Sequence, residues 1–99
     1  MSHFNLQIDD FTFRAACQDK TAAQKKIYEM FSTAVYNLVL RITHNKSDAL
    51  DISQDVFVKV FTKIKQNKSQ ESLGFWIRKI AVNTTLSYLK KNAHLITNV

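Results

Sequence analysis

Residues 73–92 read LGFWIRKIAVNTTLSYLKKN and predict a helix with apolar side chains on two opposite faces. One face has Leu73, Trp76, Ile77, Ile80 and Ala81, and the other has Phe75, Val82, Leu86 and Leu89. A helix with two apolar sides usually lies inside a bundle, with polar strips along its flanks. We therefore expect this segment to be enclosed by neighbouring helices.

The rest of the chain also reads as helical, because it has no Pro, one Gly and apolar residues that recur at spacings of three and four. We expect helices at residues 8–18, 22–44, 48–65 and 73–92. The first is short and weakly amphipathic, and it fits a frayed arm equally well. The prediction is an all-α fold, a compact bundle of three to four helices.

Helix starts and core stripes follow from the same pattern. Thr21 with Gln24 matches a capping box, and Ser47 and Ser72 are the expected N-caps of the last two helices. The expected core stripe of residues 22–44 is Ile27, Phe31, Ala34, Leu38 and Ile42. The expected stripe of residues 48–65 is Leu50, Phe57, Val60, Phe61 and Ile64.

A chain of 99 residues is long enough for a single core. We expect residues 19–92 to form the helical domain, 1–18 an arm or short helix, and 93–99 a tail. Cys17 is the single cysteine, so it has no disulfide partner within the chain, and a reducing cytoplasm fits best. The expectation is a cytoplasmic bacterial protein without membrane insertion, since no apolar run approaches about 20 residues.

Charge is distributed unevenly along the chain. Residues 1–58 hold six Lys or Arg and seven Asp or Glu, whereas residues 59–99 hold eight Lys or Arg and one Glu. The formal net charge of +6 suggests a polyanionic partner such as nucleic acid, although many ordinary proteins are equally basic. A site for a polyanion is therefore expected in the second half.

An acidic face is expected on the helix at residues 48–65. At about 100° per residue, Asp48, Asp51 and Asp55 lie opposite the expected core stripe, and Ile52 falls among them. Carboxylates near a helix N-terminus are favoured by the helix dipole, so this face fits a solvated helix start. It equally fits docking of a basic, partly apolar protein surface.

The flanks of residues 73–92 carry polar strips, with Lys79, Asn83 and Lys90 on one and Arg78 with Thr85 on the other. Cations there would bind phosphate and Asn would bond a base edge, unless the strips are merely solvated. Catalysis has little support, because the three His residues and Cys17 are far apart in sequence. We expect no enzyme activity, no metal and no cofactor.

Two segments carry a family resemblance. Residues 49–57, ALDISQDVF, and residues 75–83, FWIRKIAVN, resemble the two hallmark runs of region 2 in sigma-70-family factors, and the extracytoplasmic-function (ECF) group is the most similar branch. The resemblance covers about Asp9 to Lys91. Phe61 stands where the family often has Trp, and Ile77 where Leu is common.

The resemblance implies a sigma factor domain with two binding surfaces. One would dock on the clamp helices of the RNA polymerase β′ subunit through Asp48, Asp51, Ile52, Gln54 and Asp55. The other would recognise and melt the −10 promoter element by holding its non-template strand with one base flipped out. Its expected DNA-binding residues are Lys65, Lys68, Ser69, Ser72, Phe75, Trp76, Arg78, Lys79 and Asn83.

Within that set, Trp76 is expected mainly in the core, and Phe75 fits either packing or a wedge against a base. Complete factors of this group also carry region 4, which reads the −35 element, so this chain by itself should bind promoters weakly. Regulation by an anti-sigma factor is typical of the group. The alternatives are a helical protein-interaction module and a DNA-binding domain unrelated to sigma factors.

Overall fold

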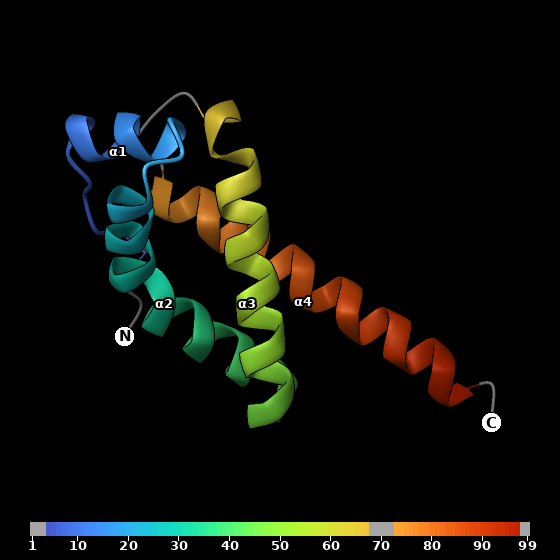
Figure 1. Cartoon of the computed structure of the whole chain (residues 1–99). Coiled ribbons are helices and arrows are strands. Elements are labelled where there is room, and N and C mark those ends of the chain that lie inside the picture. Colours follow the sequence, from blue (N-terminus) through green and yellow to red (C-terminus); the bar gives the residue numbers. More distant parts are fainter. Residues whose placement is uncertain (1–3, 68–72, 98–99) are drawn as a thin grey trace.

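The computed structural model describes residues 4–67 and 73–97, and its regular elements there are all helical (Figure 1). They are α1 (Asp10–Cys17), α2 (Thr21–Thr43), α3 (Lys46–Lys63), the short 3-10 helix η1 (Ile64–Gln66) and α4 (Leu73–Thr97). The all-α bundle is thus confirmed. In this part of the chain no helix has the length and apolar character needed to cross a membrane.

The bundle is built on α2 and α3, which lie side by side in opposite directions, and α4 packs against both and passes behind α3 (Figure 1). α1 packs near the start of α2 and close to η1. The second half of α4 projects beyond the bundle, so the molecule measures 51 Å along its longest axis against 26 and 20 Å. α4 ends five residues later than the predicted boundary at residue 92.

α1 is a capped helix. Asp9 is its N-cap, and the carboxylate accepts hydrogen bonds from Thr12 Oγ1 at 2.7 Å and Thr12 N at 2.9 Å. These two bonds lower the pKa of Asp9. After α1, Asp19 takes the left-handed conformation, with φ of 60°, and the N–H of Lys20 donates to the carbonyl of Ala15.

Two predicted N-caps are wrong. The capping box does not form, because Lys20 is the N-cap of α2 and the Gln24 side chain instead donates to the carbonyl of Ala16 at 3.3 Å, which joins α2 to α1. α3 begins earlier than predicted, since Asn45 rather than Ser47 is the cap, and its side chain accepts from Asp48 N at 2.9 Å. The expected cap of α4, Ser72, lies outside the described residues.

The core stripe of α2 is largely as predicted, with Ile42 half-buried rather than buried. The stripe of α3 is rotated. Ile52 is buried, whereas Leu50, predicted in the core, is 56% exposed. The physical reason is that α3 packs against both α2 and α4, so its buried arc shifts toward Ile52. The buried residues of α3 are Ala49, Ile52, Val56, Phe57 and Val60.

The prediction that α4 is enclosed on two sides is also wrong. Among residues 73–92, for which the structure gives burial, the buried apolar side chains are Leu73, Ile77 and Ala81, all on one face. On the opposite face Phe75 is 60% and Leu86 53% exposed. α4 therefore closes one side of a small bundle and presents its other face outward.

The N-terminal segment packs against the start of α4. Phe4 and Ile8 are buried in the core although they precede α1. A Cβ built at Gly74 would overlap the backbone carbonyl oxygen of Phe4 and would lie 3.1 Å from Cε1 of Phe31. The one glycine of the chain thus permits a close backbone approach that helps to hold the first turn of α4.

Candidate functional site

An exposed stripe runs along α3, and we call it the α3 face. It consists of Leu50, Asp51, Gln54, Asp55 and Val58, which share one side of the helix and are all exposed. Val58 is 66% exposed, so the stripe combines two carboxylates with two large apolar side chains. That combination suits a basic, partly apolar protein partner.

Two residues predicted for this surface lie elsewhere. Ile52 is 1% exposed, so its expected role in protein docking is wrong, and Leu50 and Val58 supply the apolar component. Asp48 is half-buried and accepts a hydrogen bond of 2.9 Å from the hydroxyl of Tyr88, which joins the start of α3 to α4. This bond is the main cause of a raised pKa of Tyr88.

A groove beside the α3 face extends the surface onto α2. It encloses about 260 Å³ between the two helices, with Tyr28 and Tyr36 on one wall and Leu50 and Gln54 on the other. The ring of Tyr28 meets Phe57 edge to face, with centroids 4.8 Å apart. Ser53 also lines the groove, and among the residues that the structure describes its buried Oγ has no hydrogen-bond partner.

A second exposed stripe, the α4 face, runs along the outer side of α4. It consists of Phe75, Lys79, Asn83, Leu86 and Lys90. The stripe combines an exposed aromatic ring, two ammonium groups and an amide. These are the groups that stack on bases, bind phosphates and bond base edges.

The other predicted DNA contacts have mixed positions. Arg78 is exposed beside the α4 face, whereas Trp76 is half-buried and packs against the core, as expected for a packing residue. Lys65, on η1, pairs with Asp19 at 3.4 Å, and both side chains are more than 60% exposed. Lys68, Ser69 and Ser72 lie outside the described residues.

Cys17 is half-buried, and its thiol contacts the carbonyl oxygen of Ile64 at 3.9 Å. Burial raises the pKa of this thiol, which disfavours the nucleophilic thiolate. Among the residues that the structure describes, no three His, Cys, Asp or Glu side chains cluster closely enough to hold a metal ion.

Sequence reasoning missed Val58 and Tyr28 as surface residues. Val58 lies four residues after Gln54, so the helical period alone places it on the α3 face. Tyr28 gives no such signal, because its position beside Leu50 depends on how α2 packs against α3.

Comparisons with known proteins point in one direction. Residues 27–94 match the family model described as Sigma-70 region 2. The chain is 26% identical over 65 residues to the ECF RNA polymerase sigma factor SigW of Bacillus subtilis. The matched segment covers 66% of this chain and 35% of SigW. It is 32% identical over 56 residues to the RNA polymerase sigma factor SigV of Bacillus subtilis, and this segment covers 57% of this chain and 34% of SigV.

A third relative is the ECF RNA polymerase sigma factor SigE of Mycolicibacterium smegmatis, at 30% identity over 61 residues, or 62% of this chain and 23% of SigE. The matched segment thus spans about a third or less of the length of each of these relatives. No solved structure matches the chain significantly.

Proposed function

The chain belongs to the sigma-70 region 2 family, ECF type, and on that premise we propose that it binds RNA polymerase and opens promoter DNA at the −10 element. The α3 face would dock on the clamp helices of the β′ subunit. The α4 face would hold the non-template strand. The domain would act in the bacterial cytoplasm by binding alone, with the polymerase supplying the chemistry.

The observation that carries this proposal is the separation of two exposed stripes of opposite charge on neighbouring helices. The α3 face has carboxylates at Asp51 and Asp55, and the α4 face has ammonium groups at Lys79 and Lys90. A polyanion is attracted to the second and repelled by the first. One small domain can therefore bind a basic protein surface and a nucleic acid together.

The α3 face supports protein docking because its charged and apolar groups alternate. Leu50 and Val58 bury apolar area on contact, while Asp51 and Asp55 select a basic partner. In such interfaces fewer than about a third of the residues cost more than about 1 kcal/mol of binding when truncated, and these lie near the centre of the interface.

The α4 face supports capture of an unpaired strand. Extruding a base from a duplex costs a few kcal/mol, which stacking and phosphate contacts must offset. Phe75 has an exposed ring, and stacking on such a ring is worth about 1–3 kcal/mol per base. Lys79 lies one helical turn further on, where it can neutralise a phosphate, and Asn83 follows one turn later to bond a base edge.

The test uses two leucines of matched exposure, Leu50 at 56% and Leu86 at 53%. Fluorescence anisotropy would measure binding of the 99-residue chain to the isolated β′ clamp helices and, separately, to single-stranded non-template −10 DNA. Leu50→Asp should weaken clamp binding and spare DNA binding. Leu86→Asp should do the reverse. Equal effects of both substitutions on both ligands would contradict the assignment of the two faces.

Salt dependence tests the nucleic-acid half separately. The logarithm of the affinity for the non-template strand should fall linearly with the logarithm of the salt concentration. Lys79→Gln should make this slope shallower by about 0.7, the value for one phosphate contact on a single strand. Non-template DNA should bind more tightly than the template strand. A chain that binds the clamp but shows no salt-dependent DNA binding would instead be a protein-interaction module.

An anti-sigma factor would be a further partner under this proposal. A regulator that covers the α3 face would compete with the clamp helices for Leu50 and Val58. Leu50→Asp should then weaken both complexes.

A further inference from the structure

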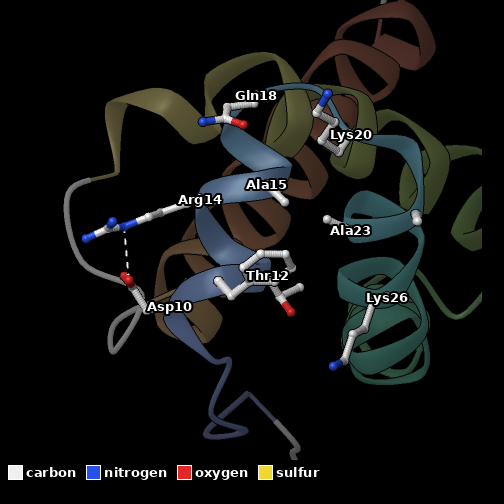
Figure 2. Close-up of a pocket in the computed structure, with 10 residues that line it drawn as sticks. Asp10, Thr12, Arg14, Ala15, Gln18, Lys20, Ala23 and Lys26 are labelled. Atoms are coloured by element: carbon white, nitrogen blue, oxygen red, sulfur yellow. Dashed lines mark ion pairs between the residues drawn. The ribbon is translucent and has the colours of Figure 1, made fainter.

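A second, larger groove lies between α1 and α2 and encloses about 710 Å³ (Figure 2). Small apolar side chains lie on both of its walls among polar and charged ones, with Ala15 on α1 and Ala22 and Ala23 on α2. Small side chains on both walls let another backbone approach closely. None of the residues that line this groove belongs to the α3 face or the α4 face.

Phe11 contributes an aromatic ring to this groove and is 82% exposed. It stands on the same short helix as Phe13, which is buried in the core. The helix therefore does not need Phe11 for its own packing. An aromatic ring of this size left open beside an apolar groove is typical of a surface that a partner covers.

The charged groups around the groove are mainly cationic, with Arg14, Lys20 and Lys26 against Asp10. Figure 2 shows Lys20 near one end of the groove and Lys26 near the other. Arg14 pairs with Asp10 at 2.9 Å and Lys26 with Asp9 at 3.7 Å, and all four side chains are at least half exposed. Exposed pairs of this kind are weak and exchange partners readily.

We propose that this groove binds an acidic amphipathic helix of a partner protein. Its apolar side chains would cover Phe11 and the alanines, and carboxylates on its flanks would meet Lys20 and Lys26. A groove between two helices suits a third helix. An amphipathic helix has apolar side chains at spacings of three and four along one face, and that face can lie in the groove. The inference goes beyond the polymerase and DNA contacts proposed above and does not depend on them.

The test uses a fluorescein-labelled synthetic helix with Leu at alternating spacings of three and four and Glu along both flanks. The reference peptide replaces every Glu by Gln. Binding of both to the 99-residue chain would be measured by anisotropy at low and high salt. We expect the Glu peptide to bind at least about tenfold more tightly than the Gln peptide at low salt, with the difference shrinking as salt rises.

Variants of the chain locate the binding. Phe11→Ala, and separately Lys20→Glu with Lys26→Glu, should each weaken the Glu peptide by about tenfold or more. Lys25→Glu is the matched control, because Lys25 is exposed on the same helix but does not line the groove. It should change affinity by no more than about twofold.

Three results would overturn the proposal. They are no binding of the Glu peptide, equal binding by all variants, and displacement of the peptide by single-stranded DNA or by a second copy of the chain at the groove. The Leu50→Asp and Leu86→Asp variants should bind the peptide normally. A failure at this groove can therefore be separated from a failure of the polymerase or DNA assignment.

Discussion

Gly74→Ala should destabilise the fold by an amount that follows from one contact. The added Cβ would overlap the carbonyl oxygen of Phe4 and would lie 2.7 Å from its carbonyl carbon. The ring of Phe31 on the other side is fully buried and cannot yield. The N-terminal segment must therefore move away from α4.

The magnitude comes from two opposing terms. Phe4 is 3% exposed, and losing that burial costs about 1.5–3 kcal/mol. Replacing Gly by Ala in a helix returns at most about 1 kcal/mol. We expect Gly74→Ala to lower the free energy of unfolding by about 0.5–2 kcal/mol, which lowers the Tm by roughly 2–10 °C for a chain of this size.

Urea denaturation followed by circular dichroism would measure this change in four proteins: wild type, Gly74→Ala, Phe4→Ala and the double variant. If the alanine acts by displacing Phe4, its cost should nearly vanish when Phe4 is already truncated. Additive costs would show that the N-terminal segment is not the group displaced. A variant more stable than wild type would refute the close approach itself.

Four further substitutions test three features of the structure. Asn45→Ala should cost about 1 kcal/mol of stability as the lost N-cap of α3, whereas Ser47→Ala should stay within about 0.5 kcal/mol, both measured by urea denaturation. Ile52→Ala should cost about 2–5 kcal/mol in the same assay, and a small cost would mean that Ile52 is not buried. Tyr88 has a raised pKa from its bond to Asp48, so the stability it contributes is present below about pH 10 and is lost as pH rises through its folded pKa. Tyr88→Phe should remove that part of the alkaline loss, and an unchanged pH profile would contradict the bond.

The helices and their approximate limits follow from the sequence because periodicity and the scarcity of Gly and Pro are local signals. The rotation of α3 does not. Leu50 and Ile52 are both β- or γ-branched aliphatic residues of similar size, and which one is buried depends on where α2 and α4 lie. Asn45 and Ser47 are likewise both good N-caps, and tertiary packing decides which one is used.

The candidate site was predicted in part for the same reason. Asp51, Gln54 and Asp55 are exposed as expected, since polar residues at helical spacing point away from any core. Phe75 could not be placed from its sequence, because the pattern predicted a helix enclosed on both sides. The Phe75 ring is exposed because α2 and α3 pack against the other face of α4, and the sequence does not show which helices cover which face.

The most direct test of the proposed function is titration of the chain against the isolated β′ clamp helices, with wild type beside Gln54→Ala and Asp55→Arg. Both side chains are exposed on the α3 face, so the variants should keep the helical content of wild type. We predict that wild type binds and that both variants bind more weakly. Failure of the folded wild-type chain to bind, or equal binding by all three proteins, would contradict the assignment of the α3 face to RNA polymerase.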